Sequence, residues 1–109
     1  MTKADLRAEM RVPVTHRGTL GIPPDTWFPC LIQDISSTGF QIMTTSNVAV
    51  GDVLELRCEL YPESLLQCKI EVRHITEMCL GTKVVEMSNT GLMLCRRFIE
   101  EHVSLKRFG

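Results

Sequence analysis

LELRCEL at residues 54–60 and LQCKIEVR at residues 66–73 alternate apolar with polar side chains. A period of two places the apolar residues on one face of a strand and the polar residues on the other. Only residues 61–65 separate the two runs. We therefore expect an antiparallel hairpin with one face on a core and one face in water.

Shorter apolar segments, separated by turn-forming residues, flank this hairpin. We expect strands at residues 12–20, 27–35, 40–45, 72–79 and 81–87, and loops at residues 21–25, 36–39 and 47–52. Pro13 confines the first strand to a sheet edge or marks the start of a strand. Ile75 interrupts the alternation, which predicts a bulge near His74.

The C-terminal part of the chain changes period. Leu92, Cys95, Ile99 and Val103 are spaced by three and four residues, as on one face of a helix. We expect this helix at about residues 90–106, with Ser88 or Asn89 as its N-cap. About six antiparallel strands without crossover helices predict a mainly β protein, a small barrel with a helix over one opening or edge.

The composition disfavours several classes of protein. The 109 residues include 12 Lys and Arg and 13 Asp and Glu, a net charge of −1. General DNA- or RNA-binding proteins depend on an excess of positive charge. No apolar run approaches the roughly 20 residues of a membrane helix, and the charged N-terminus has no signal-peptide core. We expect a cytoplasmic protein without membrane insertion.

The cysteines also point to a reducing compartment. They number five, none forms a CxxC motif, and each lies among apolar residues, which predicts buried thiols. Cys58 and Cys68 could face each other across the hairpin. The three histidines show no metal-ligand spacing, so we expect no metal. Trp27 should pack in the core or at the barrel rim, and Met43, Met78, Met87 and Met93 should fill the core.

Two short motifs could carry function. Residues 7–11, RAEMR, hold two arginines four positions apart, a pair whose guanidinium groups can bind phosphate oxygens or stack on a base. Residues 34–39, DISSTG, fit two interpretations. The aspartate, serine and glycine could simply build a turn, with glycine at positive φ. They could also present a carboxylate that accepts hydrogen bonds from a guanine edge.

The order RxxxR, strand, loop and DxSxxG resembles the PilZ domain family of bacterial cyclic di-GMP receptors. VGDVL at residues 50–54 and LGTKV at residues 80–84 are similar to later segments of the family, although Val84 stands where an aromatic residue is common. The resemblance implies a six-stranded antiparallel barrel with a C-terminal helix at residues 12–109. It also implies a flexible N-terminal arm at residues 1–11.

The resemblance further implies a ligand site for cyclic di-GMP. Arg7 and Arg11 would clamp phosphates and guanine faces, while Asp34 and Ser36 would bind a guanine edge and a phosphate or ribose. Gly39 would allow close approach of the turn backbone, and Arg73 and His74 are additional candidate contacts by position. Leu6 stands where many members have another arginine.

No catalytic constellation is present in the sequence, so we expect a receptor rather than an enzyme, with no cofactor. It would be a monomer or weak dimer that signals to an unidentified protein partner, in pathways such as motility or biofilm formation. The alternative is an adaptor for pilus or motility machinery that does not bind the nucleotide. A small thiol enzyme is a third interpretation.

Overall fold

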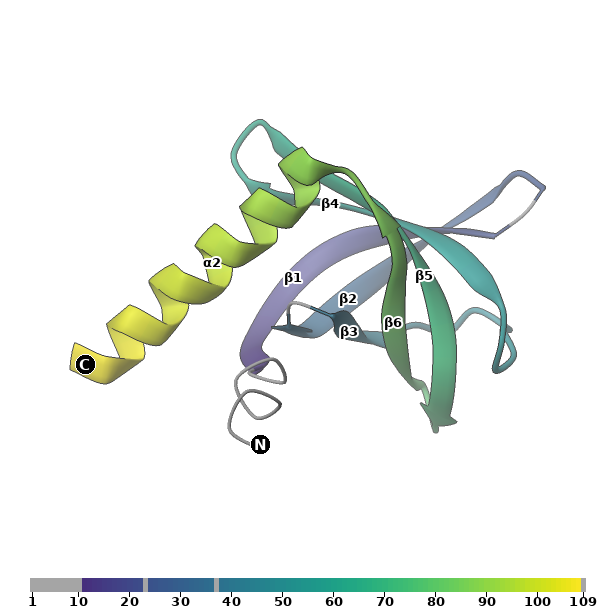
Figure 1. Cartoon of the computed structure of the whole chain (residues 1–109). Helices are drawn as coiled ribbons and strands as arrows, with labels where there is room; N and C mark the ends of the chain where they lie inside the picture. Colours follow the sequence, from purple (N-terminus) through teal and green to yellow (C-terminus); the bar gives the residue numbers. More distant parts are fainter. Residues whose placement is uncertain (1–10, 23, 37, 109) are drawn as a thin grey trace, which may run out of the picture.

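The computed structural model describes residues 11–22, 24–36 and 38–108, with side chains as far as His102. Six strands precede one helix (Figure 1). The elements are β1 Arg11–Ile22, β2 Thr26–Ser36, β3 Gly39–Met43, β4 Val53–Tyr61, β5 Ser64–Thr76, β6 Cys79–Met87 and α2 Asn89–Phe108.

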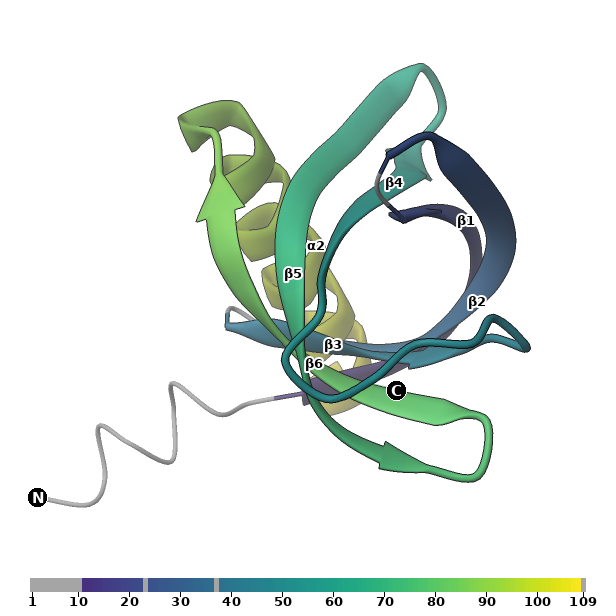
Figure 2. The same cartoon turned by 90° about the vertical axis from the view of Figure 1, so that its right-hand side faces the viewer.

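The strands form a closed antiparallel barrel in the order β1-β2-β3-β6-β5-β4. Figure 2 looks into this ring and shows α2 behind it. The helix contacts β1, β2 and β5, which lie on different sides of the ring, so it crosses one opening of the barrel. The six-stranded barrel with its covering helix confirms the predicted fold class.

The predicted central hairpin is β4 and β5, and its alternating residues divide as expected. Leu54, Leu56 and Leu60 on β4 and Leu66 and Ile70 on β5 are at most 4% exposed. Leu56 lies opposite Cys68, and Cys58 lies opposite Leu66, so the two cysteines are not direct partners. The register shifts between Val72 and His74, which confirms the predicted bulge.

Of the strand predicted at residues 72–79, residues 72–76 are extended and pair with β6, but they continue β5, and the predicted end is wrong because Glu77 and Met78 form a turn and Cys79 begins β6. Thr76 pairs with Cys79 across Glu77 and Met78, and Glu77 adopts a φ of 56°. A left-handed glutamate is uncommon, and no Gly, Asn, Asp or Pro marks this turn. The sequence therefore carries no ordinary signal for it.

The first hairpin is longer than predicted. β1 continues through Gly21 to Ile22, where a loop was expected. Gly21 pairs with Trp27, and a Cβ on Gly21 would meet the Trp27 ring, so the indole covers this glycine. Pro13 lies near the start of β1, just before a register shift, in agreement with its predicted position at a strand start.

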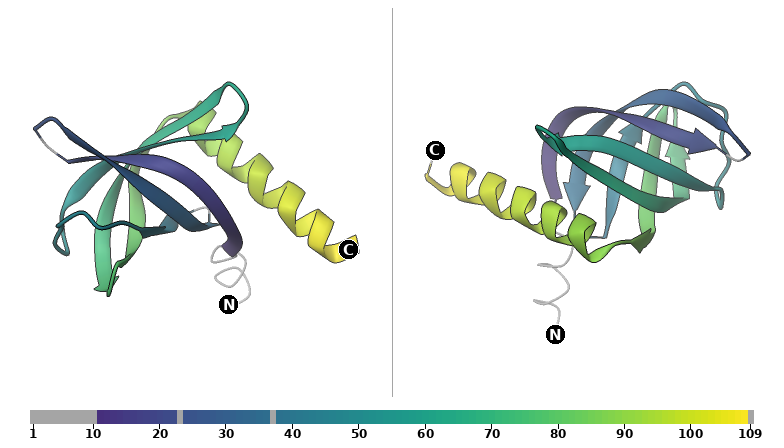
Figure 3. Two further views of the ribbon diagram at one scale, coloured as in Figure 1. Left: turned by 180° about the vertical axis from the view of Figure 1, so that it is seen from behind. Right: turned by 90° about the horizontal axis from the view of Figure 1, so that it is seen from above.

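Helix α2 begins where its cap was expected, because Ser88 Oγ accepts a hydrogen bond from the Gly91 amide at 3.1 Å. Cys95 and Phe98 are its buried side chains, whereas Leu92 and Ile99 are only half-buried. The Phe98 ring meets the rings of His16, Tyr61 and His102. Beyond this anchor the helix extends away from the strands (Figure 3). Within the described chain, no helix combines the length and apolar character needed to span a membrane.

A hydrogen bond and a cation–π contact at Tyr61 also link α2 to β4. Tyr61 Oη donates a hydrogen bond to Glu101 Oε1 at 2.7 Å, and the Arg97 guanidinium lies 4.8 Å from the centre of the Tyr61 ring. Loss of solvent and the neighbouring Glu101 carboxylate raise the pKa of Tyr61 to about 12. The same hydrogen bond and Arg97 lower the pKa of Glu101.

The predicted thiols are free, and four of them are buried. Burial raises the pKa of Cys30 and Cys95 to about 11 and that of Cys58 and Cys68 to about 12. Such thiols are almost fully protonated at neutral pH, which disfavours a thiol enzyme built on them. The methionine prediction is largely wrong, because Met43, Met78 and Met93 are 36%, 53% and 68% exposed.

Candidate ligand-binding site

The two sequence motifs meet through an ion pair. Arg11 is the first residue of β1, and its Nη1 lies 2.7 Å from Oδ1 of Asp34 on β2. The antiparallel register places Pro13 opposite Asp34 and Arg11 opposite Ser36, so the arginine reaches diagonally to the carboxylate. The Arg11 and Asp34 side chains are 44% and 21% exposed, which leaves both open to a ligand.

The Ser36 side chain, predicted to contact the ligand, lies inside the β2–β3 turn. It is 1% exposed, and its Oγ accepts hydrogen bonds from the amides of Gly39 at 3.0 Å and Thr38 at 3.3 Å. Ser36 Oγ also donates to the Gly39 carbonyl at 3.1 Å. The hydroxyl therefore holds the β2–β3 turn together and points away from solvent.

Gly39 is required by the neighbouring strand. It pairs with Lys83 of β6, and a Cβ at this position would collide with the Thr82 carbonyl oxygen. Gly39 does not have a positive φ; Gly51, at 97°, is the only described glycine that does. The expectation of a left-handed glycine in this turn is thus wrong. The glycine instead lets β3 and β6 approach closely.

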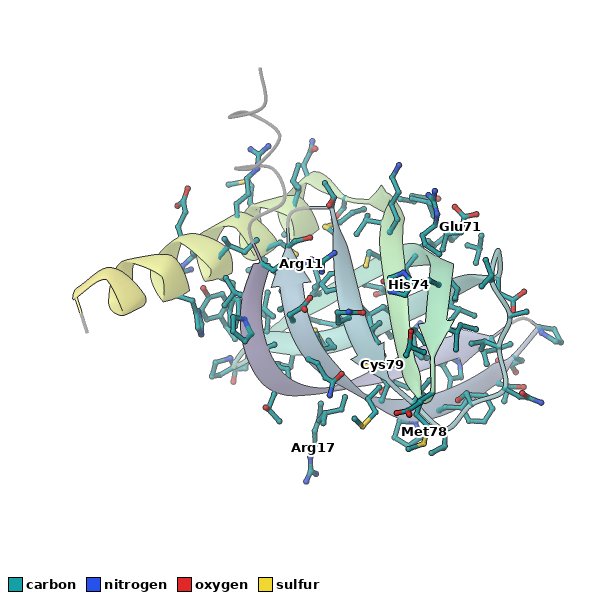
Figure 4. All side chains as sticks on the ribbon, turned by 90° about the horizontal axis from the view of Figure 1, so that it is seen from below. Arg11, Arg17, Glu71, His74, Met78 and Cys79 are labelled. Carbon is teal, nitrogen blue, oxygen red and sulfur yellow. The ribbon has the colours of Figure 1, made fainter. Side chains whose placement is uncertain are left out.

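A groove of about 400 Å³ opens beside the ion pair, and we call it the basic groove. It is lined by Arg11, Thr38, Arg73, His74, Gly81, Thr82 and Lys83. His74 pairs with Gly81, and a Cβ on Gly81 would occupy the position of the imidazole ring. The ring therefore covers Gly81 on the outer surface, and Figure 4 shows Arg11 and His74 on the same side of the barrel.

The groove concentrates positive charge in a protein whose net charge is −1. Arg11, Arg73 and Lys83 all line it, and Arg73 Nη1 lies 4.0 Å from Glu71 Oε1, a loose and exposed pair. Lys83 has no ion pair with any other described residue. An anion that enters the groove can therefore contact cations from three strands.

Four residues that line the groove were not predicted as contacts, namely Thr38, Gly81, Thr82 and Lys83, and neither was Gln41 on the adjacent strand β3. Gln41 lies on β3 between Asp34 and Gly81 in the strand register. Its Oε1 is buried without a hydrogen-bond donor among the residues that the structure describes. Alternation from buried Phe40 and Ile42 could have placed Gln41 on the outer face, but its position next to Asp34 depends on strand pairing.

Of the predicted contacts, the structure brings Arg11, Asp34, Arg73 and His74 to one surface, with Gly39 beneath it. Ser36 faces into the turn. Arg7 and the rest of residues 1–10 lie outside the described residues. No cluster of three metal-ligating side chains occurs within the part of the chain described.

The sequence profile described as PilZ domain matches residues 5–101, nearly the whole chain. The chain belongs to the PilZ domain family. The match includes both arginines of the RxxxR motif and the complete DxSxxG turn. No curated protein matches the chain significantly in sequence.

Several solved structures, two of them PilZ domains, share the fold. The PilZ domain of YcgR from Escherichia coli, solved with c-di-GMP, has a TM-score of 0.74 at 11% identity, over 90% of this chain and 92% of that chain. The PilZ domain of CeSA from a cellulose-synthesizing bacterium has a TM-score of 0.66 at 10% identity, over 90% and 99% of the two chains. PlzA of Borreliella burgdorferi, in complex with c-di-GMP, has a TM-score of 0.68 at 13% identity, over 85% and 40%.

Proposed function

We propose that this protein is a bacterial receptor for cyclic di-GMP and has no enzymatic activity. The observation that carries the proposal is the 2.7 Å contact between Arg11 and Asp34 beside the basic groove. This contact joins one residue from each family motif on an accessible surface. Two structural neighbours, the YcgR domain and PlzA, were solved with this nucleotide, which supports the choice of ligand.

The chemistry of the groove matches the ligand. Cyclic di-GMP carries two negative charges and two guanine bases. Arg11 has five N–H donors, so it can keep its contact with Asp34 and still bind a phosphate with another edge. The second carboxylate oxygen of Asp34 accepts hydrogen bonds from the guanine N1 and N2 donors. Lys83 and Arg73 balance the remaining charge, and the His74 ring offers a flat surface to a base.

In this proposal Arg11 stays in β1, and the residues before it, 1–10, form an arm that closes over the nucleotide. Arg7 provides the second guanidinium group, while Ser36 and Gly39 position the turn rather than touch the ligand. Binding changes the conformation of the arm and the charge of the surface around it. A protein partner then distinguishes the bound from the free surface.

The test is calorimetric titration of the full chain with cyclic di-GMP, with GTP and cyclic di-AMP as controls. We expect saturable binding of cyclic di-GMP alone. Binding should be about a hundredfold weaker for Arg11→Ala, which loses a phosphate contact, and for Asp34→Ala, which loses the acceptor for the guanine edge. Arg96→Ala is the matched control, since Arg96 is an exposed arginine on α2. No binding by the folded wild type would overturn the proposal in favour of a nucleotide-independent adaptor.

A further inference from the structure

A second surface of the barrel is apolar and exposed. Trp27, Pro29 and Leu31 alternate along β2 with residues that face the core, and Met43 pairs with Leu31 on β3. The carbonyl of Met78, in the β5–β6 turn, accepts a hydrogen bond from the Thr44 amide, so Met78 lies beside Met43. We call Trp27, Pro29, Leu31, Met43 and Met78 the apolar band. Trp27, Met43 and Met78 are 37%, 36% and 53% exposed.

The band contains a hollow and carries positive charge at its margin. A hollow of about 450 Å³ lies between Leu31, Met43, Met78 and Arg17. Arg17 pairs with Leu31 across β1 and β2, and Arg57 lies 4.2 Å from the centre of the Trp27 ring. Both arginines are exposed, and neither has a carboxylate partner among the described residues.

The closed barrel limits what can bind to this surface. At the hollow β2 has a neighbour on both sides, because Leu31 pairs with Arg17 of β1 and with Met43 of β3, so a partner strand cannot add there. A partner must therefore insert side chains. Exposed methionines adapt their shape to different apolar side chains, and the flanking arginines favour carboxylates around that apolar contact.

We propose that the apolar band binds an acidic amphipathic helix of a protein partner. Its apolar face fills the hollow beside Met43 and Met78, and its Asp or Glu side chains reach Arg17 and Arg57. The surface thus supplies a docking site for the partner of the proposed receptor, yet its chemistry does not require the nucleotide.

The band borders the nucleotide surface. Met43 pairs with Cys79, and Cys79 Sγ donates a hydrogen bond to Gln33 Oε1 at 2.8 Å. Gln33 is the bulge residue between Ile32 and Asp34. Asp34 in turn forms the ion pair with Arg11. Figure 4 shows Arg17, Met78 and Cys79 toward one end of the strands and Arg11 and His74 farther along the same side. A partner on the band would therefore lie next to a nucleotide-bound groove.

The experiment is methyl NMR of the full chain labelled on its methionine methyl groups, titrated without nucleotide. The probe is a designed 18-residue amphipathic helix with leucines on one face and glutamates on the other. A matched peptide has lysines in place of the glutamates. We expect the acidic peptide to shift the Met43 and Met78 signals but not that of Met93, an exposed methionine on α2. We expect Arg17→Glu to weaken this binding about tenfold and Arg96→Glu to leave it unchanged.

Each other outcome would overturn the inference. Equal binding of the lysine peptide would remove the role of the arginines, and an equal shift of Met93 would show unspecific apolar contact. Shifts of Met43 and Met78 with vesicles of anionic lipid, but not with the acidic peptide, would make the band a membrane surface. If neither the Met43 nor the Met78 signal shifted at millimolar peptide, the band would not be a docking site. Because the titration contains no nucleotide, its failure is distinct from failure to bind cyclic di-GMP.

Discussion

The basic groove and the apolar band occupy the outside of the same barrel, and they are built alike from the backbone upward. In each, a ring from one strand covers a glycine on its neighbour: His74 covers Gly81, and Trp27 covers Gly21. They differ in the side chains around that ring. The groove surrounds it with cations and a carboxylate, whereas the band surrounds Trp27 with apolar side chains and one stacked arginine.

One barrel thus carries two chemically different outer surfaces, because outward residues are free of the core. Inward residues such as Leu20, Ile32 and Ile42 are fully buried and must be apolar. The outward residues between them have no such constraint. Experiments that perturb the shared interior should therefore affect both surfaces, and changes on the outer face should separate them.

The largest effect should be a loss of stability at alkaline pH, caused by the thiols in the interior that both surfaces share. Burial raises the folded-state pKa of Cys30, Cys58, Cys68 and Cys95 from 9.0 to between about 11 and about 12. The folded state then binds more protons than the unfolded state, so this stability is present below pH 9 and is lost as pH rises toward these values. We expect each thiol to remove roughly 1 kcal/mol from the free energy of unfolding between pH 8 and 9.5.

Urea unfolding under reducing conditions measures this change. Cys58→Ala is the control, since it should lose stability overall but show a smaller fall between the two pH values. Measuring at or below pH 9.5 limits the contribution of Tyr61 to the change in stability. Its raised pKa of about 12 makes it lower the free energy of unfolding only at higher pH. A stability that is constant from pH 8 to 9.5 would contradict the prediction.

The next effect should be local to the floor of the groove. Gly39→Ala places a methyl group against the Thr82 carbonyl, a backbone atom that cannot rotate away. We expect a loss of about 2–3 kcal/mol in the free energy of unfolding. Gly51→Ala is the matched control, because Gly51 has a φ of 97° but open space around it, and should lose about 1 kcal/mol. An equal loss in the two variants would show that steric contact with β6 is not what requires Gly39.

The groove is polar and the band is apolar, and this difference decides how far each could be predicted from the sequence. The groove was partly predictable: Arg11 and Asp34 belong to recognisable motifs, Arg73 and His74 were candidates by position alone, and Thr38 and Lys83 were not predicted. The band was not predicted, because an apolar residue in an apolar strand resembles core. Met43 and Met78 were expected to fill the core, yet both are exposed, and Trp27 packs over Gly21 near the β1–β2 turn while staying 37% exposed.

The fold shows a similar limit. Alternation in β4 and β5 predicted that hairpin, since period and burial agree there residue by residue. The turn at Glu77 was missed because its positive φ is held by the pairing of Thr76 with Cys79, a tertiary constraint. Phe98 was missed as the anchor of α2 because its position depends on the rings of His16 and Tyr61, which come from distant strands.

A charge-reversal pair should separate the two surfaces. Lys83→Glu removes a cation from the groove, and Arg17→Glu removes one from the band. We expect the first to weaken cyclic di-GMP binding about tenfold and leave the acidic peptide unaffected, and the second to do the reverse. Calorimetry with both ligands on both variants measures the four affinities. If either variant weakened both ligands equally, long-range charge rather than local contact would explain binding.

The smallest effect should come from Gln41, which lies between Asp34 and Gly81 in the register. Its buried Oε1 has no donor among the described residues, so Gln41→Met replaces an unsatisfied oxygen with a side chain of similar shape. We expect the free energy of unfolding to rise by about 1 kcal/mol. Nucleotide affinity measured on the same variant then decides whether Gln41 contacts the ligand. Unchanged affinity would mean that Gln41 has only a structural role. A tenfold loss of affinity despite higher stability would mean that the ligand provides the missing donor, so that the groove extends across β3 to Asp34.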